Sequence, residues 1–461
     1  MEKKVLLVNP YNTKSDHIQP PLGLAFLATA SRNAGFDVSL LDANKKRMSF
    51  KKFKSYLKRN TFDFIGFQLY TANLNYVKQA LDLIKKINPS TTTVVGGPHP
   101  SALPEKIFKQ MGDCLDFAFR GEVEIGFPLL LKYYKKTSYF KNIPGLIYRD
   151  GIKIIANPPL FFHDLDQLGL PSWDLIRPQT YPEAQHGAFF KKFPIAPIIT
   201  TRGCPYNCGF CGGKLNTGRV FRKRSVEDIL KEIRLLYQKY KIREFHIVDD
   251  NFTLDADFAK KLLEGIKKLN LKASFAVPNG VRLNTLDDDL LKLMREVGFY
   301  IISVGIESGS NRILKEMNKL ITVKEIEDKI KLINKYKIPV AGFFILGYPG
   351  ETEKEIKKTI NFSLKLKLLR ANYFLFLPLP GTPIYKKLEK EKLIPEDIQN
   401  WSFNSVKSFS GVSTKKLKKY QRQAFLRFYL LRPKTMIRNI LCIRRPRQII
   451  FLLTRALRWV F

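Results

Sequence analysis

Residues 204–211 read Cys-Pro-Tyr-Asn-Cys-Gly-Phe-Cys and contain three of the five cysteines in this 461-residue chain. The spacing Cys-x3-Cys-x2-Cys brings three thiols into one short loop, with the aromatic Phe210 directly before the last thiol. Three thiolates from such a loop can bind three irons of a four-iron cluster and leave the fourth iron open. An open iron can bind a substrate or cosubstrate, as an open position does on other catalytic metals.

A zinc site and a set of structural cysteines are two other interpretations of this loop. A zinc knuckle normally shows a second Cys/His pair at a regular spacing. No such pair follows, since His246 is isolated and Cys442 lies near the C-terminus. Disulfides are disfavoured in a chain with so few cysteines and no signal peptide. The loop therefore favours an inorganic cluster held by Cys204, Cys208 and Cys211.

Strand–helix units repeat on the C-terminal side of the cysteine loop and predict the scaffold that carries it. An apolar strand at 195–201 leads into the loop, and Ser225 fits the N-cap of the first helix. Further strands are expected at 245–249, 273–277, 300–306, 340–346 and 373–377. Because a complete TIM barrel has eight units, the six units in residues 195–400 predict a partial (β/α)6 barrel.

Polar and glycine-rich loops follow the predicted barrel strands, which is where barrels carry their chemistry. The candidate residues in these loops are Asp249, Asp250, Asn251, Arg282, Glu307, Ser308, Gly347 and Pro378. Glu307 could instead be an acidic residue that is favoured at a helix N-terminus.

Residues 1–140 alternate short apolar strands with amphipathic helices, which predicts a doubly wound, Rossmann-like parallel sheet. No G-x-G-x-x-G follows the first strand, so a dinucleotide site is unsupported. Ligands on such sheets bind at the carboxyl ends of the strands. The residues at those ends are Asn9, Pro10, Tyr70, Thr71, Gly96, Gly97, His99, Gly121 and Glu122.

The cysteine loop resembles the signature of the radical S-adenosylmethionine (SAM) enzymes. In the N-terminal region, Pro21-Leu22-Gly23-Leu24, the Gly35 turn with Asp42, and residues 94–100 resemble the cobalamin-binding domain that is fused to many of these enzymes. The loops after the last three barrel strands resemble the cobalamin-linked members. This resemblance covers nearly all of residues 1–400.

The resemblance implies a [4Fe-4S] cluster, SAM and cobalamin as cofactors, with the fourth iron chelating the amino and carboxylate groups of SAM. It implies SAM contacts from Phe210, Asp249, Asp250, Asn251, Arg282, Glu307, Ser308, Gly347 and Pro378. It implies corrin contacts from Asn9, Pro10, Leu22, Gly23, Tyr70, Thr71, Gly96, Gly97, His99, Gly121 and Glu122. The chain has no Asp-x-His-x-x-Gly, so we expect no protein histidine on cobalt.

The resemblance also implies a methyltransferase acting on an unactivated carbon or phosphorus centre through a 5′-deoxyadenosyl radical. It implies a small-molecule or lipid-like substrate and an electron donor such as flavodoxin or ferredoxin. One alternative is an oxidative cyclase or rearrangement enzyme that transfers no methyl group, and another is a non-catalytic cobalamin- or metal-binding sensor. An RNA methylthiotransferase would carry a second cysteine set in its N-terminal domain, where this chain has only Cys114. A nucleic-acid partner is therefore disfavoured.

Residues 141–194 join the two domains. Asp150-Gly151 predicts a hairpin, and the many prolines that follow predict a semi-rigid linker.

Basic residues dominate the chain, and the C-terminal region most of all. The formal net charge is +38, and from Gly411 onward there are fourteen Lys or Arg residues and no Asp or Glu. Residues 401–461 therefore predict a basic helical region that ends in Trp459-Val460-Phe461. It either lies at a membrane interface or packs on the barrel with a solvated basic face. We expect a cytoplasmic protein, with peripheral contact at the inner face of the membrane under the first alternative.

Overall fold

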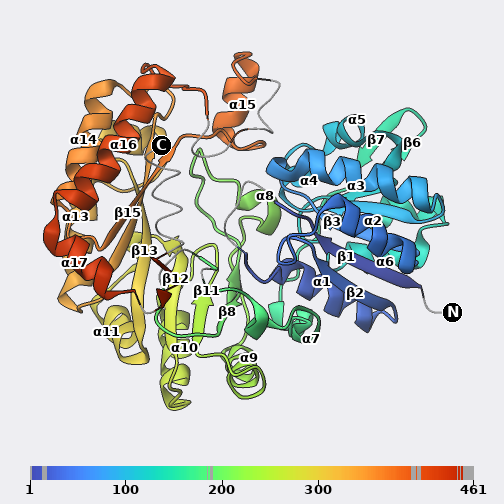
Figure 1. Ribbon diagram of the computed structural model, residues 1–461, viewed down its shortest axis with the longest axis horizontal. Helices are drawn as coiled ribbons and strands as arrows, with labels where there is room; N and C mark the ends of the chain where they lie inside the picture. The colour runs from blue at the N-terminus through green and yellow to red at the C-terminus, as the bar shows by residue number, and fades with distance from the viewer. Residues whose placement is uncertain are drawn as a thin grey trace.

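The computed structural model describes residues 3–12, 18–183, 185–186, 190–395, 401, 406–443, 445–446 and 448–449. Two α/β lobes lie side by side, and the chain completes the first lobe before it begins the second (Figure 1). Among the described residues, no helix combines the length and apolar character needed to cross a bilayer.

The first lobe is built on a seven-stranded sheet with the order β2-β1-β3-β4-β5-β6-β7. Strands β1 to β5 are parallel, and apolar cores cover both faces of the sheet. This confirms the doubly wound sheet, whose order reverses between β1 and β3, the place where such folds bind ligands. The strands are β1 Lys4–Asn9, β2 Asp37–Asp42, β3 Phe64–Gln68, β4 Thr92–Gly96, β5 Phe117–Phe119, β6 Leu146–Asp150 and β7 Lys153–Ala156. The helices are α1 Leu22–Asn33, α2 Phe50–Arg59, α3 Leu74–Ile87, α4 Pro98–Ala102, α5 Ile107–Met111 and α6 Gly126–Tyr133.

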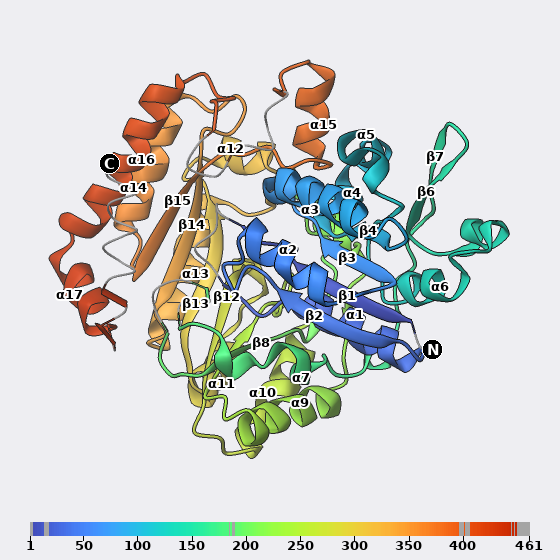
Figure 2. The same cartoon turned by 45° about the vertical axis from the view of Figure 1, so that its right-hand side comes forward.

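The predicted hairpin at Asp150-Gly151 forms, but it belongs to the first sheet and is not a separate connector. Strand β6 pairs antiparallel with β5, and β7 pairs antiparallel with β6. Figure 2 shows this hairpin projecting from the edge of the first lobe. It therefore covers the short edge strand β5, which would otherwise offer unpaired backbone groups.

The proline-rich segment after the hairpin is fastened to both lobes. Thr29 Oγ1 of the first lobe donates a 2.8 Å hydrogen bond to the carbonyl of Leu170. In helix α7 (Trp173–Ile176), Trp173 Nε1 donates to buried Glu232 of the second lobe at 2.9 Å. These contacts fix the linker as part of the interface between the lobes.

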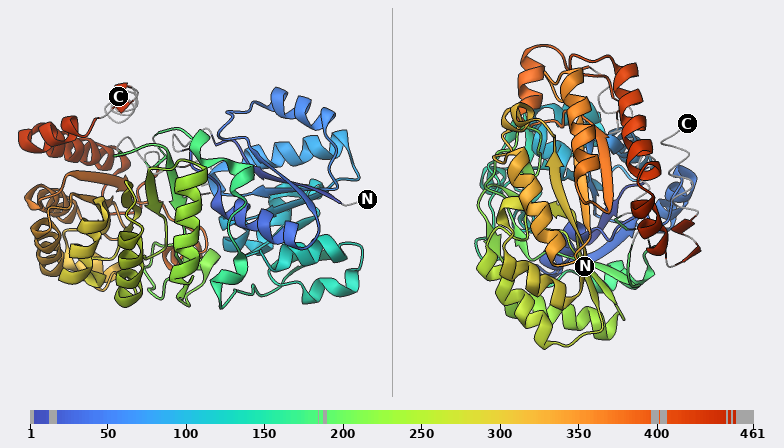
Figure 3. Two further views of the ribbon diagram at one scale, coloured as in Figure 1. Left: turned by 90° about the horizontal axis from the view of Figure 1, so that it is seen from below. Right: turned by 90° about the vertical axis from the view of Figure 1, so that its left-hand side faces the viewer.

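The second lobe is a six-stranded parallel sheet with the order β15-β14-β13-β12-β11-β8. The two edge strands, β15 and β8, do not pair with each other, so the barrel is not closed. This confirms the predicted partial (β/α)6 barrel. The helices pack on its outer side (Figure 3). The strands are β8 Ile195–Ile198, β11 Glu244–Ile247, β12 Ser274–Val281, β13 Phe299–Glu307, β14 Val340–Leu346 and β15 Arg370–Leu375. The helices are α9 Val226–Lys239, α10 Ala256–Lys268, α11 Asp288–Val297, α12 Asn311–Glu316, α13 Val323–Lys335, α14 Glu353–Lys365 and α15 Pro383–Lys390.

Side-chain caps explain where most of the long barrel helices begin. The residue before each of five helices accepts a hydrogen bond from a backbone N–H in the first turn, which satisfies a donor that the helix leaves free. These caps are Ser225, Asp255, Asp287, Thr322 and Thr352. The prediction for Ser225 is confirmed.

Two helices of the basic C-terminal region are described. Helix α16 (Thr414–Leu430) packs on β15 and α14 and buries Leu417, Ala424 and Phe428. Helix α17 (Pro433–Leu441) follows it. The alternative of a helix packed on the barrel therefore holds for α16. The predicted terminal run through Trp459-Val460-Phe461 lies outside the described residues.

Candidate functional site

The cysteine loop follows β8 and β9 (Thr201–Arg202) and is clamped by backbone hydrogen bonds. Gly209 N donates to Met317 O at 2.9 Å, and Gly209 O accepts from Ile384 N at 3.1 Å. Phe210 packs against a buried cluster that contains Met317 and Tyr348. The loop thus has a fixed shape, set by segments more than a hundred residues away in the sequence.

The three thiols of the loop lie close enough to influence one another. Burial raises the pKa of Cys204 and of Cys211, and the neighbouring cysteines raise both further. No group of three or more His, Cys, Asp or Glu side chains in the described part of the chain is arranged around a single metal ion. In a cubane each thiolate binds a different iron, so three neighbouring thiols in one short loop fit such a cluster.

Arg282, which follows β12, lies beside the cysteine loop. Its Nη1 donates to Cys208 Sγ at 3.4 Å, and its guanidinium stacks on Tyr206 at 3.6 Å from the ring centre. Its Nη2 donates to the carbonyl of Lys319. The predicted SAM residue Arg282 is therefore placed against a thiol of the cysteine loop.

Glu307 at the end of β13 forms a buried ion pair that the sequence did not indicate. Lys319 Nζ donates to Glu307 Oε1 at 2.7 Å, and the two side chains are only 10% and 8% exposed. A Cβ on Gly305 would lie 2.2 Å from Glu307 Oε1 and 2.8 Å from Lys319 Nζ, so the pair depends on this glycine. Glu307 also has a positive φ of 63°, a strained conformation that is frequent at functional sites.

The Asp249-Asp250-Asn251 tract after β11 holds the cysteine loop in place. Asp249 accepts hydrogen bonds from Thr200 N at 2.7 Å and from Thr201 Oγ1 at 2.9 Å. Asp250 accepts from Gly203 N at 3.0 Å. Asn251 Nδ2 is buried without a hydrogen-bond partner in the structure. The two carboxylates are thus committed to the protein, and the Asn251 amide is the group of the three with a free donor for a ligand.

Three other predicted SAM residues are placed differently from those beside the cysteines. Ser308 Oγ lies 3.1 Å from Thr359 Oγ1 of α14. A Cβ on Gly347 would lie 2.5 Å from a methyl carbon of Leu417 of α16. Pro378 is buried in the segment after β15. Ser308 and Gly347 therefore pack towards the outer helices, whereas Phe210, Asn251, Arg282 and Glu307 lie around the cysteine loop.

Glu351, in the loop after β14, is a buried carboxyl with an upward-shifted pKa. Burial raises its pKa to about 8, although Gly347 N and Tyr348 N donate to one of its oxygens. In the unfolded chain the Glu351 carboxyl ionises near pH 4.5, whereas in the folded protein it keeps its proton to about pH 8. The contribution of Glu351 to the free energy of unfolding is therefore present at low pH and is lost as the pH rises to about 8.

Glu351→Gln should remove this pH dependence. From pH 5 to 8, the wild-type free energy of unfolding should fall relative to the variant by ~1.4 kcal/mol for each pH unit, and the difference should level off above pH 8. Urea unfolding of both proteins across this range measures the difference. A difference that stays constant with pH would show that Glu351 is ionised in the folded protein.

A cavity of about 270 Å³ lies between the two lobes at the carboxyl ends of both sheets. Asp250 and Thr201 of the barrel line it, and Asp250 also lies within electrostatic reach of Cys204 and Cys211. The first lobe contributes a wall rich in glycine, where backbone replaces side chains and leaves room for a bulky flat ligand. The glycines in this wall are Gly23, Gly66, Gly96, Gly97 and Gly121.

Six of the predicted corrin residues line this cavity: Gly23, Tyr70, Gly96, Gly97, Gly121 and Glu122. The other five, Asn9, Pro10, Leu22, Thr71 and His99, do not. Asn9 Nδ2 donates to Asp42 Oδ1 at 2.9 Å, and Leu22 belongs to the hydrophobic core. Gly97 has a φ of 110° and its Cβ position lies 3.3 Å from the backbone of Leu69, so this turn favours glycine.

His99 is buried, and both of its ring nitrogens lie within hydrogen-bond distance of protein groups. Nε2 donates to Gln110 Oε1 at 2.8 Å, and Nδ1 lies 3.0 Å from Thr71 Oγ1. Burial lowers the pKa of His99, which favours the neutral ring. The side chain is thus held within its own lobe.

Buried ion pairs join the two lobes at the wall of the cavity. Arg222 of β10 (Arg222–Lys223) donates to both oxygens of Glu122, at 2.8 and 2.7 Å. Arg202 of β9 donates to Glu124 at 2.8 Å. All four side chains are at most 7% exposed. The Glu122 carboxylate is therefore occupied by an arginine of the other lobe, which sequence analysis did not predict.

The two lobes match two known families. The radical SAM superfamily matches residues 198–363, and the B12 binding domain matches residues 8–131. An uncharacterized methyltransferase of Pyrococcus horikoshii is 32% identical over 426 residues, which are 91% of this chain and 90% of that protein. Cytidylyl-2-hydroxyethylphosphonate methyltransferase of Streptomyces wedmorensis is 27% identical over 449 residues, 86% of this chain and 83% of that protein.

The fold is also similar to that of the cobalamin-dependent S-adenosylmethionine radical enzyme OxsB, solved with aqua-cobalamin and S-adenosylmethionine bound. The TM-score is 0.77 at 19% identity, and the likeness covers 98% of this chain and 70% of that chain. Both lobes and their arrangement are thus shared with a solved enzyme. With the two domain matches and a relative at 32% identity over nine-tenths of its length, the chain belongs to the cobalamin-binding-domain family of radical SAM enzymes.

Proposed function

We propose that this protein is a cobalamin-dependent radical SAM methyltransferase that acts on an unactivated carbon or phosphorus centre. The observation that carries the proposal is the cavity between the lobes. One wall is the glycine-rich end of the first sheet, and the other contains Asp250, which neighbours the cysteine loop. A corrin and a cluster-bound SAM would thus lie next to each other between the lobes.

The three thiols of Cys204, Cys208 and Cys211 would hold a [4Fe-4S] cluster, and the glycine-lined wall would hold cobalamin. When bound, the cluster supplies an electron that cleaves SAM to a 5′-deoxyadenosyl radical, and the corrin supplies the methyl group. In such enzymes the cofactors carry the difficult chemistry, and the protein supplies binding and orientation.

The chain's own residues would orient SAM and keep the site dry. The free amide donor of Asn251 fits an acceptor on SAM, and the Glu307–Lys319 pair offers one anionic and one cationic group near Phe210. Arg282 would hold its guanidinium beside Cys208. Because these groups are buried and already held by the protein, they would need little rearrangement when SAM binds.

Product mass tests the proposal and separates it from a cyclase or rearrangement enzyme. Anaerobically purified protein should show the visible bands of both cluster and corrin. With SAM, a reductant and substrate, it should give 5′-deoxyadenosine and a product in which a methyl group replaces one hydrogen. A product of unchanged carbon count would reject methyl transfer, and protein that binds no corrin would reject the assignment of the first lobe.

The substrate class and the electron donor belong to the same proposal. A small-molecule or lipid-like substrate is compatible with a cavity between the lobes. A flavodoxin or ferredoxin is the expected donor, because the cluster needs single electrons at low potential. Of the three loop cysteines, Cys211 is the exposed one, so we expect the donor to approach the cluster from its side.

Cobalt coordination gives a separate prediction. Since both nitrogens of His99 lie within hydrogen-bond distance of Thr71 and Gln110, His99→Gln should leave the axial ligation of bound cobalamin unchanged. Electron paramagnetic resonance of the cob(II) form measures this through nitrogen hyperfine coupling. Coupling that is present in the wild type and lost in the variant would identify His99 as a cobalt ligand.

A further inference from the structure

Helix α17 has its polar and apolar faces reversed relative to a packed surface helix. Its buried residues are Thr435 and Asn439, and Asn439 Nδ2 donates to the carbonyl of Leu369 at 2.9 Å. Its outward residues include Ile437, Ile440 and Leu441, which are 53%, 55% and 69% exposed. A helix normally buries its apolar stripe against the protein core. This helix instead turns that stripe towards the surroundings.

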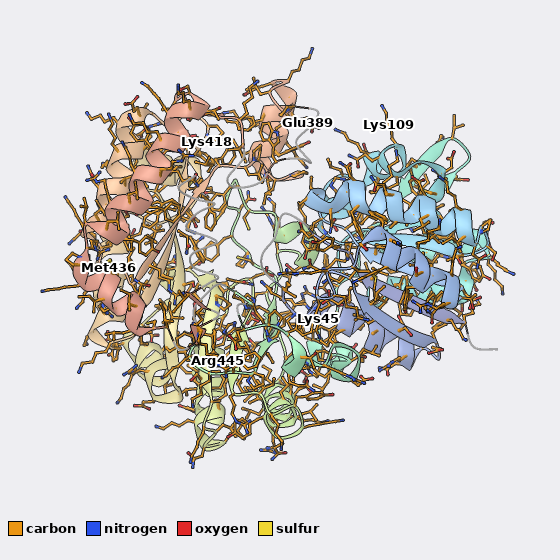
Figure 4. All side chains as sticks on the ribbon, viewed as in Figure 1. Lys45, Lys109, Glu389, Lys418, Met436 and Arg445 are labelled. Atoms are coloured by element: carbon orange, nitrogen blue, oxygen red, sulfur yellow. The ribbon has the colours of Figure 1, made fainter. Side chains whose placement is uncertain are left out.

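The apolar surface extends beyond α17 into a continuous region of the chain. Fifteen large apolar side chains are exposed in the described residues, and eight of them lie between Leu426 and Ile449. Figure 4 places Met436 at the outer edge of the molecule, on the side away from the first lobe. Concentrated exposure of this kind marks an interaction surface.

A pocket with four cations lies beside this surface. Lys367, Arg432, Lys434 and Arg438 line it, and the residues that line it include no acidic side chain. Arg432 Nη1 is buried and has no hydrogen-bond partner, although Nη2 donates to the carbonyl of Leu366 at 3.1 Å. Burial lowers the pKa of Arg432, and the charge of Arg438 lowers it further. Four like charges around one pocket, with a buried donor free, fit an anion with several oxygens.

We propose that α17 and its cationic pocket form a docking surface for an anionic phospholipid membrane. The outward apolar side chains would enter the acyl-chain boundary, and the pocket would receive a lipid phosphate. A second copy of the chain would fit the apolar face but not the pocket, because the surface presents only cations. Nucleic acid would bind the cations through its phosphates but would leave the apolar face uncovered.

The place of α17 in the fold defines what docking would do. The helix contacts residues 366–369, which precede β15, whereas the cysteine loop lies at the carboxyl ends of the strands. The docking surface is therefore at the opposite end of the barrel from the candidate active site. Docking would hold the enzyme at the membrane and leave the cavity between the lobes free.

Vesicle flotation with the full-length protein tests this surface. The wild type should bind vesicles that contain phosphatidylglycerol and not vesicles of phosphatidylcholine alone. Ile437→Ser/Ile440→Ser should weaken binding roughly tenfold or more, since both side chains lose their burial in the membrane. The matched control Ile152→Ser/Leu160→Ser removes two exposed apolar side chains, one from the β6–β7 hairpin and one from the proline-rich segment, and should bind like the wild type.

The charge contribution has its own matched pair of variants. Arg438→Glu should weaken binding on the order of tenfold, whereas Lys109→Glu, with the same charge change on the distant first lobe (Figure 4), should have little effect. Equal losses from these two variants would show non-specific attraction and would overturn the proposal.

If free phosphate or a second copy of the chain occupies this surface instead of a membrane, these experiments should give different results. Wild-type binding that survives Ile437→Ser/Ile440→Ser would rule out insertion of the apolar face. Binding of inorganic phosphate that Arg438→Glu abolishes, without any binding to vesicles that contain phosphatidylglycerol, would identify a site for free phosphate instead of lipid. A dimer that this double variant converts to a monomer, without vesicle binding, would identify a second copy as the occupant. Each of these outcomes would overturn membrane docking.

Discussion

Cys208→Ala is expected to abolish the cluster and all cleavage of SAM. Cys208 is the buried central thiol of the loop and the one that Arg282 contacts at 3.4 Å. Two remaining thiolates would leave two irons of a cubane without protein ligands, so the cluster should not assemble. After anaerobic reconstitution the wild type should contain about four irons per chain, and the variant close to none. Formation of 5′-deoxyadenosine should fall below detection.

Cys442→Ala provides the matched control for the loss of one thiol. Cys442 is half-buried near the amino-terminal ends of the barrel strands and packs beside Ile301 and Leu369. This variant should retain the iron content and the SAM cleavage of the wild type. If Cys208→Ala still produced 5′-deoxyadenosine, the assignment of the loop as the cluster site would be wrong.

Glu122→Gln is expected to destabilise the protein by about 3–5 kcal/mol, because removal of one charge from a buried ion pair leaves the other uncompensated. Glu122 is bonded through both oxygens to Arg222, and Arg202 lies 3.4 Å away. The variant would leave two buried guanidinium groups with one fewer carboxylate between them. Denaturant unfolding of the protein without cofactors measures the loss.

An exposed ion pair between the same lobes is the matched control. Lys106 Nζ lies 2.6 Å from Glu389 Oε1, but the two side chains are 54% and 40% exposed. Glu389→Gln should therefore change the free energy of unfolding by no more than ~1 kcal/mol. Glu122→Gln with wild-type stability but weaker cobalamin binding would instead identify Glu122 as a ligand of the corrin, as the sequence suggested.

The regular elements could be predicted because their periodicity is local. Alternating apolar runs located β1 to β5 and all six barrel strands within a few residues, and the Cys-x3-Cys-x2-Cys spacing predicts the loop that would hold the cluster. The same signals placed the hairpin at Asp150-Gly151 but not its partner, because pairing with β5 depends on tertiary contacts.

The site residues that could not be predicted act across long sequence distances. Lys319 pairs with Glu307, and Arg222 pairs with Glu122 a hundred residues earlier. A single lysine or arginine in a loop carries no spacing signal in a chain with 79 basic residues. For Gly347, the sequence predicted the loop but not what the residue packs against. Its loop follows a barrel strand, as expected, but its α-carbon packs against α16 because the C-terminal helix covers that side of the barrel.

The buried joint between the lobes has a consequence for the order of assembly. The cavity is partly open, but a corrin bound in it would contact both lobes and would exchange most easily when the lobes separate. Separation would break the Arg222–Glu122 and Arg202–Glu124 pairs and the contacts of the proline-rich segment. This joint should then slow the exchange of the cofactor, and occupancy would depend in part on whether cobalamin was present while the lobes came together.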